Sequence, residues 1–310
     1  MKPVTRVLAA ALLCSAPFRA SAQSVEADRL KVAMLTARWT GPMLASNAET
    51  LPAGHFYTEP YFFDVASGGR HHPGSSGFYQ YGLLEGFTVG LQPSFALGTR
   101  KHNRGMAIGD FTLLSQLRLT HFTPEHPIPT VAIVLQEVIP TGRHDRLDAR
   151  EEGHGSGSFA TQVGVNVQHY FLMKNGRLLR ARINILETVP HGAVVAGRSV
   201  YGTGPGFRGK AKPGSRTTLI GAVEYSLTRE WVVALDVIRE STTETTVKGR
   251  NGDDPLVKQK FPATHYVGFA PAIEYNWSDR TGLLVGIWIN PRGHNTGRSV
   301  IPAIAFSRFW

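Results

Sequence analysis

The sequence has a single cysteine, and beyond its N-terminus it has no long apolar run. Cys14 follows Leu13, where a lipoprotein signal has a small residue, so we expect no lipid anchor. No later stretch reaches the roughly 18 uncharged apolar residues of a helical membrane span. These absences exclude a disulfide framework, thiol chemistry and helical membrane spans, but they leave open strands that cross a membrane.

The first 22 residues have the pattern of a secretory signal peptide. Lys2 and Arg6 supply the positive start, residues 7–16 form the apolar core, and residues 20–22 (Ala-Ser-Ala) are a small-residue cleavage site. We therefore expect residues 1–22 to be removed and the mature chain to act outside the cytoplasm of a Gram-negative cell. The net charge of +10 is basic, but a secreted chain rarely meets nucleic acid, so we expect no nucleic-acid partner.

From residue 52 onward the hydrophobic pattern repeats every two residues, which is typical of β-strands. In residues 265–278, for example, Val267, Phe269 and Ile273 share one face, and small or polar residues occupy the other. Twelve segments follow this pattern: 55–66, 77–83, 87–97, 109–121, 130–140, 158–172, 178–189, 217–227, 231–240, 264–277, 282–289 and 299–310. The sequence predicts an all-β fold, a transmembrane antiparallel up-and-down β-barrel of about 12 strands, over residues 52–310.

The connections between these segments alternate in length. The short set is 84–86, 122–129, 173–177, 228–230 and 278–281, and the long set is 67–76, 98–108, 141–157, 190–216, 241–263 and 290–298. Outer-membrane barrels have short periplasmic turns and longer outside loops. We therefore expect an outer-membrane location with both termini in the periplasm, and Trp231 and Trp277 in the periplasmic aromatic girdle.

Two features of the strands carry further predictions. The chain ends in Phe309-Trp310, which resembles the signal that the barrel-assembly machinery reads, although Arg308 stands where an apolar residue is usual, and we expect that machinery as a partner. Four prolines fall inside predicted strands, where each removes a hydrogen-bond donor: Pro60, Pro93, Pro271 and Pro302. We expect β-bulges or strand ends at these prolines.

Residues 23–51 do not follow the strand pattern. Val32, Met34 and Leu35 alternate irregularly with basic residues before the stretch Trp39-Thr40-Gly41-Pro42. Two interpretations remain open, an N-terminal periplasmic extension and a plug segment that folds into the lumen.

Charged residues on the inward face of the strands are the main functional signal. Seven lie at similar distances from the short turns: Glu59, Arg118, Arg180, Arg182, Glu224, Asp236 and Glu274. They predict a lumen constriction with acidic and basic sectors that would orient a solute. We expect Glu224 to pair with Arg180 and Arg182. A barrel of 12 strands lies between packed and open sizes, so a lumen held shut by the same ion pairs is the alternative.

The long connections are rich in basic residues. Residues 190–216 carry no acid, and residues 98–108 add Arg100, Lys101 and Arg104. The basic residues of 190–216 are Arg198, Arg208, Lys210, Lys212 and Arg216. They predict a surface that faces outer-membrane lipid and binds lipopolysaccharide phosphates. The alternatives are ordinary solvation of flexible loops and attraction of anionic solutes to the mouth.

No motif for catalysis, a metal or a cofactor emerges. His71, His72, His144 and His154 fall in predicted outside loops without ligand spacing. His169 faces outward, but no serine nucleophile motif accompanies it. We expect no metal, no cofactor and no enzyme activity, with an outer-leaflet lipid-modifying enzyme as one alternative and a structural or adhesive barrel with a closed lumen as another.

Three short motifs carry a family resemblance. Residues 51–61 (Leu-Pro-Ala-Gly-His-Phe-Tyr-Thr-Glu-Pro-Tyr) open the barrel, Tyr81-Gly82-Leu83 ends the second strand, and residues 139–142 (Ile-Pro-Thr-Gly) end the fifth. In these motifs the chain resembles the transporter-like outer-membrane barrels of the MetA-pathway of phenol degradation family. The resemblance implies an outer-membrane channel or transporter for small, often aromatic, solutes. It names neither a particular solute nor catalytic residues.

Overall fold

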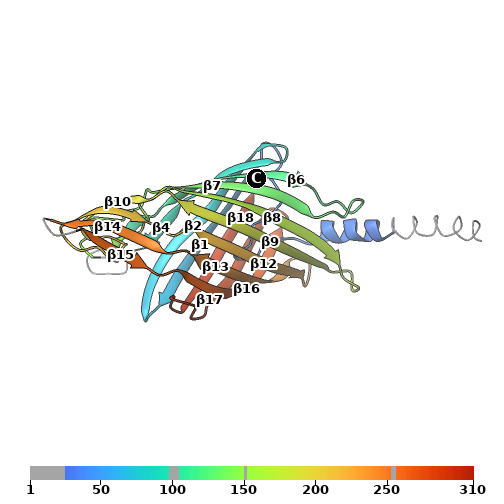
Figure 1. Ribbon diagram of the computed structural model, residues 1–310. Helices are drawn as coiled ribbons and strands as arrows, with labels where there is room; N and C mark the ends of the chain where they lie inside the picture. Colours follow the sequence, from blue (N-terminus) through green and yellow to red (C-terminus); the bar gives the residue numbers. More distant parts are fainter. Residues whose placement is uncertain (1–24, 98–104, 150–151, 253–255) are drawn as a thin grey trace, which may run out of the picture.

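The chain forms a closed antiparallel β-barrel of 12 strands (Figure 1). This computed structural model describes residues 25–97, 105–149, 152–252 and 256–310. Strand β1 pairs with both β2 and β18, so the sheet closes on itself. No helix among the described residues is long and apolar enough to span a membrane. The predicted signal peptide and the basic residues Arg100, Lys101 and Arg104 lie outside the described residues.

The strands of the wall follow one another in chain order, as the sequence predicts. They are β1 (Phe56–Ser67), β2 (Arg70–Leu84), β3 (Phe87–Gln92) continued by β4 (Ser94–Leu97), β5 (Met106–Ile108) continued by β6 (Phe111–Thr120), β7 (Thr130–Ile139), β8 (Ala160–Leu172), β9 (Leu178–Pro190), β12 (Arg216–Ser226), β13 (Trp231–Thr242), β16 (Thr264–Ser278), β17 (Thr281–Asn290) and β18 (Ser299–Phe309). Except at the second strand, which begins earlier, the predicted bounds agree to within a few residues.

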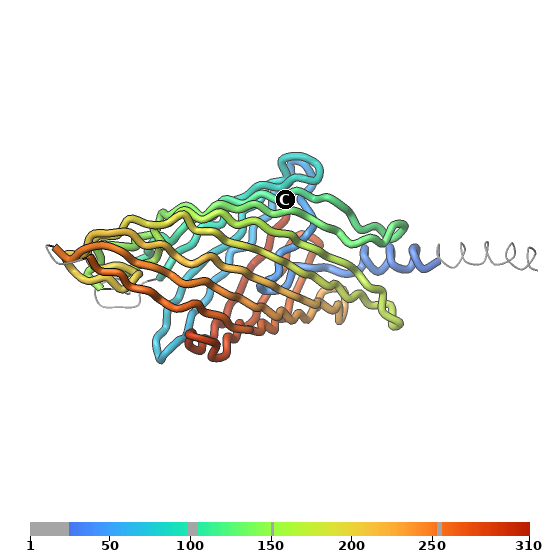
Figure 2. The backbone as a smooth tube through the Cα atoms, in the orientation of Figure 1, coloured from blue at the N-terminus to red at the C-terminus, as the bar shows by residue number. Residues whose placement is uncertain are grey.

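Four further strands extend beyond the barrel. They are β10 (Ala193–Ala196), β11 (Phe207–Lys212), β14 (Thr245–Asn251) and β15 (Val257–Phe261), which pair as one four-stranded sheet. This outer sheet lies at the end of the molecule opposite the helix of residues 25–36 (Figures 1 and 2). The predicted long connections at 190–216 and 241–263 are confirmed, and each contains two short strands, with β11 of the first connection paired to β14 of the second.

The predicted long connection 67–76 is also wrong. β1 and β2 join through a turn at Gly68-Gly69, and both glycines have positive φ (57° and 74°). A two-residue hairpin turn of this kind requires positive φ at both positions, which glycine adopts without a steric penalty. His71 and His72 accordingly lie within β2 rather than in a loop.

The alternation of side chains places apolar groups outside. In β16 Val267, Phe269 and Ile273 are exposed, while Ala270 and Glu274 on the other face are buried. An apolar outer band and a polar interior are what a barrel in a bilayer requires.

The two tryptophans predicted for the aromatic girdle face outward. The exposed fractions are 41% for Trp231 and 44% for Trp277. Their rings form a row with Tyr275 and Phe306, with neighbouring centroids 4.7–5.9 Å apart. The row lies at the strand ends next to the short turns, where amphipathic rings suit the membrane interface.

The prolines are accommodated differently from the prediction. Pro93 separates β3 from β4 as expected, but Pro60, Pro271 and Pro302 lie in continuous strands. At Pro60, for example, pairing with β18 skips from Thr58 to Tyr61 while pairing with β2 continues, and the register is unchanged. The missing amide donor of Pro60 thus interrupts the pairing with β18 and leaves the pairing with β2 intact. The register shifts in the described strands lie elsewhere, near the turns that follow β2, β6 and β16.

The first two motifs of the family resemblance meet in space at the entry to β1. The Gly54 amide donates to the Gly82 carbonyl at 2.8 Å, and the Gly82 amide donates to the His55 carbonyl at 2.9 Å. A Cβ atom on Gly82 would lie 2.0 Å from the Pro52 carbonyl oxygen. The two motifs therefore form one junction, where the chain leaves the interior and enters the wall.

Candidate functional site

Residues 37–51 run from the N-terminal helix into the interior of the barrel (Figure 2). We call them the luminal segment. Its anchor is the helix, whose Leu30 and Ala33 pack against Phe122 and Leu178 in a buried cluster. From residue 37 the chain is not helical. The Arg38 amide donates to the Arg229 carbonyl at 3.1 Å, and side chains of the barrel wall contact the residues that follow.

Two of the predicted luminal acids hold the backbone of this segment. The amides of Thr40 and Gly41 donate to Glu274 Oε2 at 2.7 and 3.1 Å. The amides of Leu44 and Ala45 donate to Asp236 at 3.3 and 2.9 Å. Backbone amides that lack a strand partner must be satisfied in another way when they are buried, and here carboxylates supply the acceptors.

Neutral amide side chains continue the same row. Asn184 accepts from the Ser46 amide at 2.8 Å and donates to the Ser46 carbonyl at 3.1 Å. Gln116 donates to the Glu49 carbonyl at 2.9 Å, and Asn166 donates to Gln116 at 3.0 Å. The sequence reasoning passed over these amides because it followed charge alone. Their inward positions in the two-residue alternation are the signal that would have found them.

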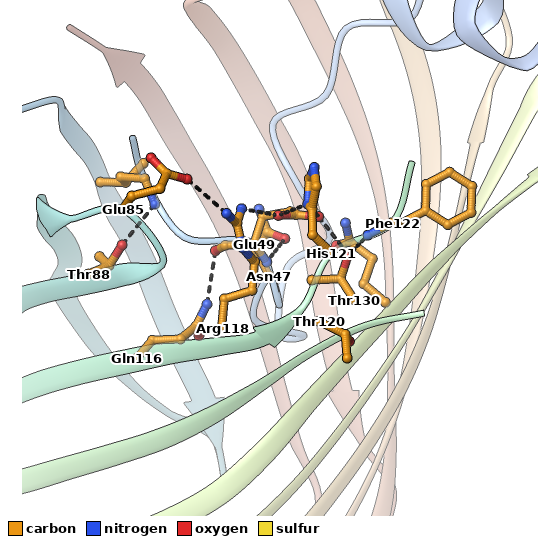
Figure 3. A network of polar contacts seen from close by, with 12 residues as sticks. Asn47, Glu49, Glu85, Thr88, Gln116, Arg118, Thr120, His121, Phe122 and Thr130 are labelled. Atoms are coloured by element: carbon orange, nitrogen blue, oxygen red, sulfur yellow. Dashed lines mark hydrogen bonds and ion pairs between the residues drawn. The ribbon is translucent and has the colours of Figure 1, made fainter. Parts of the chain in front are cut away.

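Glu49 joins the luminal segment to the strands β6 and β7 (Figure 3). Its carboxylate contacts Arg118 at 3.0 Å and His121 at 3.1 Å, and it accepts a hydrogen bond from the Thr130 hydroxyl at 2.6 Å. Arg118 also contacts the exposed Glu85 at 2.8 Å. Arg118 therefore pairs with the segment and with the turn after β2, and not with the other six luminal charges.

The predicted pairing of the two luminal arginines with Glu224 is confirmed. Arg180 and Glu224 form a two-bonded ion pair, and Arg182 Nε lies 3.0 Å from Glu224 Oε2. Arg182 also donates to the Ala45 carbonyl at 2.8 Å, and Arg180 lies 4.5 Å from the centre of the Trp39 ring. The segment and the ion pairs thus form one buried polar network.

Glu59 differs from the other luminal acids. Its side chain projects inward from β1 between Tyr57 and Tyr61 and is 7% exposed. Among the described residues its Oε1 atom has no hydrogen-bond partner, and no basic side chain lies within ion-pair distance. The inward face of β1 therefore carries a buried carboxyl group that has no ion-pair partner among the described residues.

A cavity of about 320 Å³ lies between the luminal segment and the wall. On the wall side it is lined by residues of most of the barrel strands, with Glu59 of β1 and Arg182 of β9 among them. Aromatic rings surround these polar groups: Trp39, Tyr57, Tyr61, Phe78 and Phe309. The structure brings Arg180, Arg182, Glu224, Glu274 and Asp236 around the segment, places Glu59 at the cavity and sets Arg118 apart with Glu49.

The outside basic residues fall into two groups. Arg198 donates to the Asp148 carbonyl and Arg216 lies 3.9 Å from Glu240, so both have partners within the protein. Arg208, Lys210 and Lys212 are exposed on β11.

Tyr201, in the connection of residues 190–216, joins this connection to residues 141–157. Burial raises the pKa of Tyr201 to about 12, and its hydroxyl donates to the Ser156 carbonyl at 2.5 Å. The hydroxyl is therefore a neutral donor under physiological conditions, and this bond fixes residues 190–216 against residues 141–157.

Comparisons with solved structures find the same architecture in outer-membrane proteins. The COG4313 outer membrane channel from Pseudomonas putida F1 is similar with a TM-score of 0.56 and 10% identity, over 86% of this chain and 100% of that chain. The NanC porin has a TM-score of 0.49 and 10% identity, over 81% of this chain and 98% of that chain. No protein-family model matches the chain, and no curated protein matches it either. At this identity the first likeness shows a shared fold.

Proposed function

We propose that this protein is an outer-membrane channel or transporter for small solutes, aromatic ones among them, and that it is not an enzyme. The observation that carries the proposal is the cavity between the luminal segment and the wall. A closed barrel with a polar interior has one route for a solute, along its axis, and the cavity lies on that route.

The lining of the cavity supports the solute class. Five aromatic rings offer faces for a planar solute, and Glu59, Arg180 and Arg182 offer polar groups that would orient it. The resemblance to the MetA-pathway of phenol degradation family points to the same class. One protein of similar fold is an outer membrane channel.

Passage of a solute larger than the cavity requires the luminal segment to move. The mature chain has no cysteine, so an introduced pair can form only the intended disulfide. We would combine Ala45→Cys with Ala222→Cys, because both residues belong to one buried cluster between the segment and the wall. Oxidation should lower single-channel conductance and solute uptake in liposomes, and reduction should restore both.

Loosening the segment gives the opposite expectation. Asn184→Ala combined with Asp236→Ala removes four hydrogen bonds to the backbone of residues 44–46. This variant should conduct more than the unmodified protein. Unchanged conductance in both the locked and the loosened variants would contradict the channel and favour the second candidate, a structural barrel with a closed lumen. The buried network around Glu224 and Glu274 is the observation behind that second candidate.

A further inference from the structure

The outer sheet has one apolar face and one basic face. On β11 Phe207 and Ala211 are buried and on β14 Val247 is buried, whereas the alternate residues of both strands point to solvent. The exposed face carries seven cations from three neighbouring strands: Arg208, Lys210, Lys212, Lys248, Arg250, Lys258 and Lys260. The four cations of β14 and β15 were not among the residues predicted to bind lipopolysaccharide.

The strand register places these cations directly opposite one another. Arg208 pairs with Arg250, and Lys210 pairs with Lys248, which in turn pairs with Lys258. Like charges at paired positions of neighbouring strands destabilise a sheet. An anion that binds to this face would therefore reduce the repulsion between the paired cations.

Little within the protein offsets this repulsion. In the part of the chain that the structure describes, the ion pairs on this face consist of Glu244 with Lys260, at 2.7 Å. The sequence also has Asp253 and Asp254 between β14 and β15, outside the described residues. Six of the seven cations thus face solvent without an ion-pair partner among the described residues.

The apolar face makes the spacing of the cations rigid. A buried cluster of Ala193, Val195, Phe207, Ala211 and Val247 backs the sheet. Cβ atoms on Gly209 and Gly249 would lie 2.8 and 2.5 Å from the Phe207 ring, so these glycines make room for it. Residues 144–147 bond to the free edge of β10, where the Ala196 amide donates to Asp145 at 2.9 Å. Neighbouring cations are therefore held roughly 7 Å apart along a strand and about 5 Å apart between strands.

We propose that this basic face binds the phosphate groups of lipopolysaccharide. The outer sheet stands at the end of the barrel opposite the N-terminal helix, beyond the strands that cross the membrane (Figures 1 and 2). Phosphorylated glycolipid forms the surface there, and phosphate accepts charge-assisted hydrogen bonds from lysine and arginine. At the observed spacing one phosphate can contact cations of two strands. The proposal is independent of the channel, because it requires nothing of the lumen.

The test compares two double variants of the full barrel in detergent micelles, titrated with purified lipopolysaccharide. Lys210→Gln with Lys248→Gln removes one cross-strand pair of cations. Lys174→Gln with Arg177→Gln removes two exposed cations from the short turn at the other end and is the matched control. Each cation near an anionic surface contributes about fivefold to affinity, so the first variant should bind roughly 25-fold more weakly. The control should bind like the unmodified protein.

Two further measurements keep the outcome unambiguous. Lys210→Arg with Lys248→Arg keeps the charges and should retain binding, and dephosphorylated lipopolysaccharide should bind weakly to every variant. Equal weakening by the control variant, or equally tight binding of the dephosphorylated glycolipid, would overturn the proposal. Single-channel conductance of the Lys210→Gln/Lys248→Gln barrel should stay normal, which separates this surface from the proposed channel and shows that the variant is folded.

Discussion

Glu224 and Glu59 are both carboxylates buried inside the barrel, but the groups around them differ. Glu224 is fully buried and contacts two guanidinium groups, whereas Glu59 has no basic side chain within ion-pair distance among the described residues. At the scale of single residues, we expect the first carboxylate to affect stability and the second to affect permeation.

Glu224→Gln should destabilise the barrel strongly. The substitution leaves Arg180 and Arg182 buried without their anion, which typically costs about 3–5 kcal/mol. Glu85→Gln is the matched control, because it also removes an arginine partner but at an exposed site, where the expected cost is about 0–1 kcal/mol. Urea unfolding of the barrel in liposomes, followed by heat-modifiable gel migration, measures both. Equal costs would show that Glu224 is not the anion that balances the arginines.

Glu59→Gln should alter permeation rather than folding. The amide keeps the shape of the side chain and removes an ionisable carboxyl group that lines the cavity. Cation preference in an alkaline bath, where the carboxyl group is ionised, should fall, which a reversal potential in a potassium chloride gradient records. A preference identical to that of the unmodified barrel would place the ion path away from this cavity.

At the scale of elements, the junction between the luminal segment and β1 depends on close backbone contact. Residues 52–55 lie over Gly82 of β2, and two hydrogen bonds join the chain to that position. The junction determines both where the segment ends and where the first strand begins, so it aligns the interior with the wall.

Gly82→Ala should therefore weaken the junction. The added methyl group would meet the Pro52 carbonyl, and overpacking of this kind costs roughly 1–3 kcal/mol. Gly221→Ala is the matched control, because Gly221 also lies within a strand but has open space at its Cβ position. Urea midpoints should fall for the first variant and stay close to the original for the second. A stable Gly82→Ala barrel would mean that residues 52–55 can move away from β2 without cost.

At the scale of the whole molecule, the two ends of the barrel differ in construction. Residues 173–177 and 228–230 are short turns at the end with the N-terminal helix, and the outer sheet projects from the opposite end (Figure 1). This asymmetry is that of an outer-membrane barrel with its termini in the periplasm.

Cysteine labelling of intact cells tests this orientation. Pro205 is exposed in the connection between β10 and β11. The cysteine of a Pro205→Cys variant should react with a membrane-impermeant maleimide. Asn175→Cys, in a short turn at the opposite end, should react only after the cells are opened. Labelling in the reverse order would invert the topology. The single native cysteine, Cys14, lies in the predicted signal peptide, so Cys14→Ser in both variants removes any background from this protein.

The sequence by itself determined the twelve strands of the barrel wall and the side chains that face outward. Alternation is a local property, because successive side chains of a strand always point to opposite faces, and a bilayer permits apolar groups on only one of them. The pairing of Arg180 and Arg182 with Glu224 could also be predicted, because the three residues lie on inward faces of consecutive strands at similar distances from the strand ends, where opposite charges on neighbouring strands attract.

The tertiary structure alone decided how the interior and the outer surface are organised. Two interpretations of residues 23–51 fitted the sequence, and the described contacts of residues 37–51 join positions far apart in the chain, such as Arg182 with Ala45 and Thr40 with Glu274. The basic face likewise depends on the register between β11 and β14, which belong to two different connections. Contacts of this kind follow from closure of the barrel, and no local pattern of residues encodes them.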